Sequence, residues 1–148
     1  MKIGLIFSSV FASPALFKSK IFAPRDLLTD LSNGLLKRGH NVTVFATEDF
    51  PTQAKIVPTS LDYLQNPPEY HKFVRASLAQ KKWQQSEYAK RNFELATICN
   101  TFKAFKDGQI EVLHAYHDSS LFITHYIEVL FDAPVFYTIH DPLPPEGA

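Results

Sequence analysis

The chain has 148 residues, 45% of them hydrophobic, and its 15 lysines and arginines balance 15 aspartates and glutamates. This length suits one globular domain with a core of its own and is too short for two full-sized domains. The neutral balance excludes a basic surface spread over the whole domain, so no nucleic-acid partner is expected. No uncharged apolar run reaches the length needed to span a bilayer.

The first third of the chain predicts a strand, a helix and a second strand. Residues 3–7 form an apolar run without alternation, which is typical of a strand buried on both faces. Pro24 stands where a helix can begin, and Gly39 is placed to end it. Residues 42–46 are rich in β-branched residues and predict a strand parallel to the first. The leucines at helical spacing between them are Leu27, Leu28, Leu31, Leu35 and Leu36.

The beginning of the chain also allows another interpretation, a signal peptide. Lys2 precedes a mostly apolar run, and Val10 and Ala12 are spaced like a cleavage site. We favour the buried strand, because it fits the elements that follow. The single cysteine, Cys99, allows neither an internal disulfide nor a paired-cysteine zinc motif. This fits a reducing compartment, and a cytoplasmic location is expected.

The middle of the chain predicts a loop and a long helical segment. Residues 47–68 contain four prolines and predict a loop with one short strand at residues 55–57. Residues 69–106 lack proline and glycine and predict one long helix or two abutting ones. Asp107 and Gly108 end this segment.

Two further strands, at residues 110–116 and 135–139, are predicted with a helix between them. Ser119 or Ser120 would cap that helix, which would run to residue 130 or 131. Alternating strands and helices predict an α/β fold, with an open, mostly parallel, Rossmann-like sheet and helices on both faces. Each crossover is expected to be right-handed.

Residues 69–106 carry eight lysines and arginines against three glutamates, in a chain that is neutral as a whole. A basic helical surface with interleaved aromatic residues predicts a weak peripheral contact with the inner face of an anionic membrane. The alternative, which we favour, is a solvated helical face whose aromatic side chains pack inward. The aromatic residues in question are Phe73, Trp83, Phe93, Phe102 and Phe105.

Polar side chains stand at the ends of several predicted strands. In an open parallel sheet, ligands bind beyond the carboxyl ends of the strands. Asp118 can instead cap the helix that follows it, and serine, aspartate and histidine are ordinary turn residues. The sequence lacks the glycine-rich dinucleotide fingerprint, the phosphate-binding glycine-lysine loop and the serine nucleophile elbow. The candidate site residues are Ser8, Ser9, His117, Asp118, His140 and Asp141, with Thr47 to Asp49 at another strand end.

A metal site is the alternative use of these side chains. His114, His117, Asp118, His140 and Asp141 could supply nitrogen and oxygen ligands to one ion. Because successive strand residues point to opposite faces, the spacing of His114 and His117 argues against a shared ion. His114 lies inside a predicted strand and is interpreted as a histidine satisfied within the core. No metal is expected.

Three segments together resemble family 4 glycosyltransferases. They are the leucine-rich helix followed by Arg38-Gly39-His40 and a strand, residues 111–117, and residues 137–141, in the family's order and spacing. The resemblance implies a GT-B architecture, in which two Rossmann-like domains face each other across a cleft. Residues 1–148 would be the N-terminal, acceptor-side domain, and the C-terminal nucleotide-sugar domain would lie outside this sequence. Arg38-Gly39-His40 is assigned to structure, with His40 closing the helix end.

The resemblance implies a retaining hexosyltransferase that uses a nucleoside diphosphate sugar as donor, without a cofactor. The partners would be the C-terminal domain and a sugar or lipid-linked acceptor, and the chain alone would be inactive. His140 corresponds to the family histidine that hydrogen-bonds the transferred sugar, and His117 to one near the acceptor. A non-catalytic, Rossmann-like ligand-binding or regulatory module is the alternative, and a metal-dependent hydrolase is the third hypothesis.

The first loop departs from the family pattern. The family's pair of glycines falls on Phe22 and Ala23, and Lys20 falls where some members carry a lysine. Those glycines let backbone N–H groups approach the donor phosphate and the acceptor. Phe22 cannot allow that approach in the same way, so this loop is expected to be rebuilt or donor use to be altered.

Overall fold

The protein is described by a computed structural model that covers residues 1–9, 12–15, 21–59, 83–116, 125–126 and 128–139. Five parallel strands form one sheet in the order β3-β2-β1-β4-β5. This confirms the predicted open, Rossmann-like α/β fold. The strands are β1 (Lys2–Ile6), β2 (Asn41–Ala46), β3 (Lys55–Pro58), β4 (Val112–Ala115) and β5 (Val135–Tyr137).

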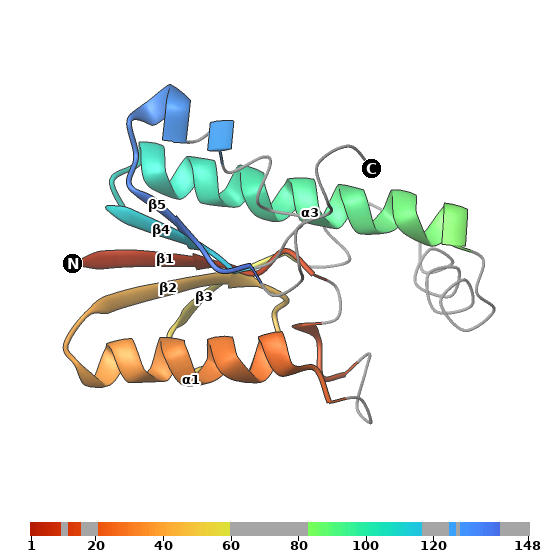
Figure 1. Cartoon of the computed structure of the whole chain (residues 1–148), viewed down its shortest axis with the longest axis horizontal. Coiled ribbons are helices and arrows are strands. Elements are labelled where there is room, and N and C mark those ends of the chain that lie inside the picture. Colours follow the sequence, from red (N-terminus) through yellow and green to blue (C-terminus); the bar gives the residue numbers. More distant parts are fainter. Residues whose placement is uncertain (10–11, 16–20, 60–82, 117–124, 127, 140–148) are drawn as a thin grey trace.

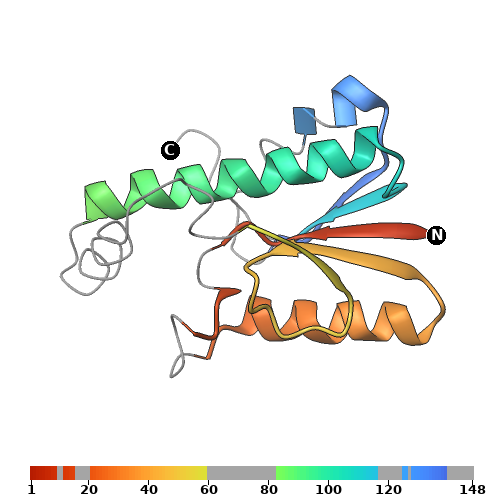
Figure 2. The same cartoon turned by 180° about the vertical axis from the view of Figure 1, so that it is seen from behind.

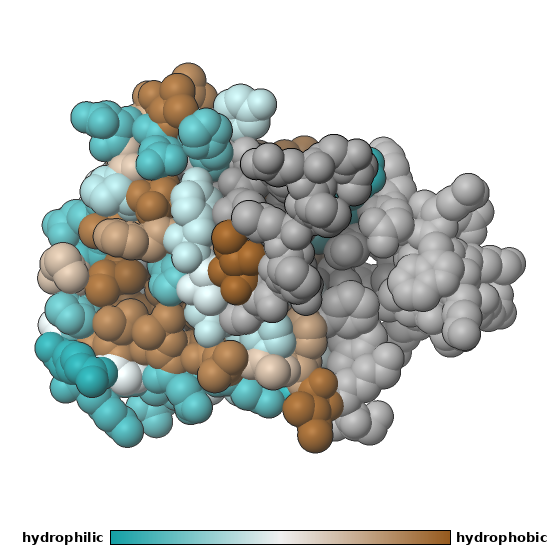
Figure 3. Space-filling view, in the orientation of Figure 1, coloured by the Kyte–Doolittle hydropathy of each residue, from teal (hydrophilic) through white to brown (hydrophobic). Residues whose placement is uncertain are grey.

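Helices cover both faces of the sheet (Figures 1 and 2). Helix α1 (Ala23–Lys37) lies on one face and helix α3 (Trp83–Lys106) on the other. Residues 125–126 and 128–131 are also helical and lie on the α3 side, where the rings of Phe102 and Phe131 are 5.4 Å apart. Figure 3 shows that brown, hydrophobic residues gather on the side of the molecule where β5 lies.

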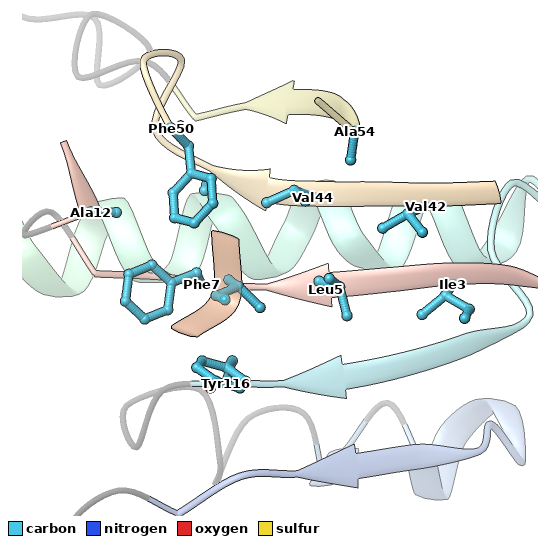
Figure 4. Packing of buried hydrophobic residues seen from close by; sticks show 11 residues of the cluster. Ile3, Leu5, Phe7, Ala12, Val42, Val44, Phe50, Ala54 and Tyr116 are labelled. Atoms are coloured by element: carbon cyan, nitrogen blue, oxygen red, sulfur yellow. The ribbon is translucent and has the colours of Figure 1, made fainter. Parts of the chain in front are cut away.

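The central strand β1 pairs with β2 on one side and β4 on the other. Lys2 is in register with Asn41, and Ile3 with both Val42 and Val112. The side chains of Ile3, Leu5 and Phe7 point to the α1 face, together with Val42 and Val44 of β2 (Figure 4). Because side chains alternate along a strand, Ile6 and Phe45 belong to the second core, on the α3 face. The strand is therefore buried on both faces, as its unbroken apolar run predicts.

Both long helices end in the same way, at a glycine with a positive φ angle. At the end of α1, Gly39 has φ 82°, its N–H donates to the Leu36 carbonyl, and the His40 N–H donates to the Leu35 carbonyl. This pair of bonds is a Schellman motif, and a glycine is the residue that adopts its left-handed position without strain. His40 thus helps to close the helix end, as expected, and it does so through its backbone N–H. Gly108 ends α3 in the same pattern, with φ 67°.

Two glycine-to-alanine substitutions in this region are expected to have opposite effects. Gly39→Ala should destabilise the domain by about 1–2 kcal/mol, because the side chain is strained in the left-handed region although it would meet no neighbouring atom. Gly34→Ala, inside α1, should stabilise the domain by about 0.5–1 kcal/mol through the lower flexibility of the unfolded chain. Urea unfolding of both variants measures the two effects, and equal shifts would contradict the assignment of the helix end.

The observed elements differ from the predicted ones mainly at their ends. The strand predicted at residues 110–116 pairs only over Val112–Ala115, and β5 ends at Tyr137, although the Thr138 N–H still donates to the Ala115 carbonyl. Leu27, one of the leucines at helical spacing, is 51% exposed, whereas Leu28 is fully buried. The predicted helix at residues 69–82 and the caps at Ser119 or Ser120 lie outside the described residues. Within the described part of the chain, no helix is long and apolar enough to cross a membrane.

Candidate functional site

The carboxyl ends of all five strands meet at one edge of the sheet (Figure 1). The chain builds β2 and β3 on one side of β1 and then crosses to the other side for β4 and β5. Strand order therefore reverses between β1 and β4, which makes this the topological switch point of the sheet. In open α/β sheets, the crevice outside such a point is where ligands bind.

Two candidate serines stand directly at this point. The chain leaves β1 through Phe7, whose N–H donates to the Phe45 carbonyl at 2.9 Å, and continues into Ser8 and Ser9. Both serines are fully buried, and the Ser9 carbonyl accepts from the Ala12 N–H at 3.1 Å, which turns the chain. The structure thus places Ser8 and Ser9 at the carboxyl end of β1, as predicted, where both are buried by the surrounding chain.

Asp49, in the loop after β2, holds the first loop in place. One oxygen of its carboxylate, Oδ2, accepts from the Ser13 hydroxyl at 2.6 Å and from the Ala15 N–H at 2.9 Å. Burial raises the pKa of Asp49, but these hydrogen bonds to the ionised form outweigh it and leave the pKa below its usual value. The sequence marked Asp49 as a strand-end residue, and its contact with Ser13 emerges only from the fold.

This contact predicts a pH-dependent contribution to stability. Asp49→Asn should lower the free energy of unfolding by about 1–3 kcal/mol at neutral pH, because an ionised acceptor is lost. The pKa of Asp49 is lower in the folded state than its ordinary value of 3.8. The extra free energy of unfolding of the wild type is therefore fully present above pH 3.8, and it is lost as the pH falls through the folded-state pKa. Urea unfolding at neutral pH and at about pH 3 compares the two proteins. A difference that does not shrink on acidification would contradict the role of the charge.

Four aromatic rings form the floor beneath this edge. The Phe7 ring lies 5.9 Å from those of Phe22 and Phe50 and 6.4 Å from that of Tyr116. Figure 4 shows Phe7, Phe50 and Tyr116 together beyond the ends of β1, β2 and β4. Burial raises the pKa of Tyr116 above its usual value, which keeps its hydroxyl neutral. We call these residues the aromatic floor.

The aromatic floor explains the position of Phe22. Phe22 immediately precedes α1, and its half-buried ring packs against Phe7. Ala23 is the first residue of α1 and is exposed. The loop that leads into α1 is therefore anchored by a side chain at a position where the resembling family has a glycine. The sequence shows that Phe22 departs from the family pattern, but it does not show that the Phe22 ring packs against Phe7.

His114, a member of the alternative metal set, is engaged within the sheet. Its Nε2 lies 2.7 Å from the Thr138 hydroxyl, and its ring stacks edge-on against Tyr116 at 5.4 Å. This agrees with its interpretation as a satisfied histidine. Among the residues that the structure describes, no three histidine, cysteine, aspartate or glutamate side chains are grouped as ligands of one ion.

Helix α3 packs its described aromatic side chains inward. Phe93 is fully buried, and Phe102 and Phe105 pack into the core on the α3 face and against Phe131. The Thr97 hydroxyl donates to the Thr59 hydroxyl at 2.9 Å, which joins the helix to the end of β3. This arrangement favours the solvated helical face over a membrane-binding one, and the peripheral membrane contact through residues 69–106 stays a prediction.

The remaining site predictions fall on residues outside the described part of the chain. β4 ends at Ala115 and β5 at Tyr137, two and three residues before positions 117 and 140 in the sequence. The carboxyl ends of β4 and β5 lie at the same end of the sheet as that of β1. The residues in question are Lys20, His117, Asp118, His140 and Asp141.

Comparison with models of known protein families and with curated proteins found no match to this chain.

Proposed function

We propose that the chain is the N-terminal, acceptor-side domain of a retaining GT-B glycosyltransferase of family 4. The observation that supports this most is the parallel sheet with its switch point between β1 and β4, because the family-like segments at residues 111–117 and 137–141 run, in the sequence, through the ends of β4 and of its neighbour β5. The parallel order β3-β2-β1-β4-β5 and the glycine stop at Gly39 agree with the domain that the resemblance implies.

In this proposal the domain binds the acceptor and orients the transferred sugar. The acceptor hydroxyl oxygen forms a bond to the anomeric carbon as the bond to the nucleoside diphosphate breaks, and the hydroxyl proton is released with the diphosphate. The transition state is oxocarbenium-like, as in glycoside hydrolysis. His140 hydrogen-bonds the transferred sugar, and His117 and Asp118 contact the acceptor. The C-terminal domain holds the nucleotide, and no cofactor takes part.

A second candidate function is a non-catalytic, Rossmann-like ligand-binding or regulatory module. The observation that favours it is the packing of Phe22 on Phe7, because this ring fills the place of a glycine that brings backbone N–H groups to a phosphate. Such a module would bind its ligand at the same switch point without transferring a sugar.

Release of nucleoside diphosphate from a panel of nucleotide sugars separates the two functions. The chain joined to a nucleotide-sugar domain is expected to release diphosphate in the presence of acceptor and to give a product with retained anomeric configuration by NMR. The chain alone is expected to turn over no nucleotide sugar. Turnover by the chain alone would contradict the two-domain proposal, and ligand binding without any turnover by the two-domain protein would favour the module.

A further inference from the structure

The helix before β5 exposes apolar side chains to solvent. It packs inward through Phe131, whose ring lies 5.4 Å from that of Phe102 on α3. Three other side chains of this helix, Tyr126, Val129 and Leu130, are 62%, 66% and 70% exposed. Because they are spaced as i, i+3 and i+4, they share one side of the helix. We call these three residues the helix stripe.

A second apolar surface lies on the other side of the sheet, over β4 and β5. The core on the α3 face takes Leu113 from β4 and Val135 from β5. Because side chains alternate along a strand, Val112 and Phe136 lie on the α1 side. Val112 is half-buried and Phe136 is 60% exposed. Parallel sheets are normally covered by helices on both faces, but among the described helices only α1 lies on this side, where it packs against β1 and β2.

Helix α1 extends this second surface. The Asn33 side chain accepts from the Gln53 N–H at 2.9 Å, directly before β3, so this side of α1 faces β3. Leu27 and Leu31 lie on the opposite side of the helix, toward β4, where Leu27 is 51% exposed and Leu31 half-buried. Figure 3 shows hydrophobic residues between α1 and β5. We use the name sheet-side surface for Leu27, Leu31, Val112 and Phe136.

The charges beside the two surfaces have opposite signs. In and directly after the helix that carries the stripe, the side chain of Glu128 is 45% exposed and Asp132 is exposed. At the end of α1, Lys37 and Arg38 are exposed. The Arg38 guanidinium donates to the Gly34 carbonyl at 3.2 Å, which holds it close to the sheet-side surface. The two surfaces therefore complement each other in charge, and both are apolar.

We propose that the helix stripe of one copy of this chain packs on the sheet-side surface of a second copy. In this contact, Val129 and Leu130 of one copy lie against Phe136 and Leu27 of the next. The carboxylates beside the stripe lie near the cations at the end of α1. Because the two surfaces differ, the contact is heterologous, and the copies associate head to tail into open assemblies or rings.

A second copy covers both apolar surfaces with a single kind of contact. An isologous contact would bring like charges together, carboxylates at the stripe or cations at the sheet-side surface, whereas the head-to-tail contact brings opposite charges together. Each surface has fewer large side chains than a standard interface of about 800 Å² per partner, so the association is expected to be weak. Neither surface includes Ser8, Ser9 or Asp49, so the inference does not depend on the proposed function.

Molar mass measured by light scattering tests the association itself. The mass of the 148-residue chain is expected to rise over about 10–1000 µM and to exceed that of a dimer. Leu130→Lys and Phe136→Lys should each weaken the association at least about a hundredfold, because each places a charge in an apolar contact. Ile21→Lys is the matched control, since Ile21 is 93% exposed and belongs to neither surface; it should leave the association unchanged. Circular dichroism verifies that all three variants fold.

A mixture of the two blocked variants tests which surfaces meet. Leu130→Lys keeps its sheet-side surface and Phe136→Lys keeps its helix stripe, so each should be monomeric alone. An equal mixture can form one intact contact and should reach the mass of a dimer and stop there.

Three results would each overturn the proposal: a wild-type chain that stays monomeric at the highest concentration, a wild-type mass that levels off at that of a dimer, and a mixture that stays monomeric. An isologous contact would give the second or third of these results. A different protein that docks at these surfaces would give the first.

Discussion

In the two-domain glycosyltransferase, His140→Ala is expected to lower turnover by a factor of about 10² or more. This is the scale for the loss of a positioned hydrogen-bonding or acid–base group. β5 ends at Tyr137, three residues earlier in the sequence, and we expect the folded domain to be nearly as stable as the wild type. The measurement is diphosphate release at saturating donor and acceptor, together with the thermal unfolding midpoint of each variant.

His125 provides the matched histidine control. Its side chain is 63% exposed and lies 3.3 Å from Glu128, in the helix before β5. His125→Ala removes a histidine that is exposed on a helix, and it should leave turnover unchanged. Normal turnover in His140→Ala would mean that this histidine is a turn residue, and equal losses in both variants would point to a general effect on the fold.

Phe7→Ala is expected to lower the free energy of unfolding by about 3–5 kcal/mol, the usual range for removing a fully buried phenylalanine. Phe7 is the shared member of three ring contacts in the aromatic floor, so its loss leaves a cavity between Phe22, Phe50 and Tyr116. Urea denaturation measures the change. Because the cavity lies below the switch point, Phe7→Ala should also weaken ligand binding at the carboxyl edge.

Leu27→Ala is the comparison for this effect, since Leu27 is half exposed on α1. Leu27→Ala should lower the free energy of unfolding by less than about 1 kcal/mol, because much of the leucine side chain is already in water. A loss for Phe7→Ala as small as that for Leu27→Ala would show that the aromatic floor does not stabilise this end of the sheet.

The parts of the fold that could be predicted from sequence are those set by local patterns. The mostly apolar runs at residues 3–7 and 42–46 favour burial on both faces, which a parallel sheet covered by helices provides. Gly39 and Gly108 marked helix ends, because the left-handed conformation there is costly for other residues. The strand ends were less certain, since pairing with a neighbour, and not the apolar run itself, decides where a strand stops.

The contacts of the candidate site could not be predicted in the same way. Ser13 and Asp49 are 36 residues apart, and no local pattern relates a loop serine to a carboxylate after the next strand. Phe22 was recognised as a departure from the family pattern, but its role depends on the ring of Phe7 on another element. The position of Ser8 and Ser9 at the carboxyl end of β1 could be predicted from the apolar run before them, whereas the switch point beside them depends on the strand order, which no local pattern gives.

The central place of β1 has a consequence for how the protein is made. β1 leaves the ribosome before the other four strands of this sheet, and its β2 partner follows soon after, but Ile3 must also pair with Val112. At synthesis rates of about 5–20 residues per second, the second flank of β1 stays unpaired for several seconds after β2 has emerged. During that interval the nascent chain exposes an apolar strand edge, which is the feature that chaperones bind. Closure of the sheet therefore waits for β4, and we expect folding to be limited by this one long-range pairing.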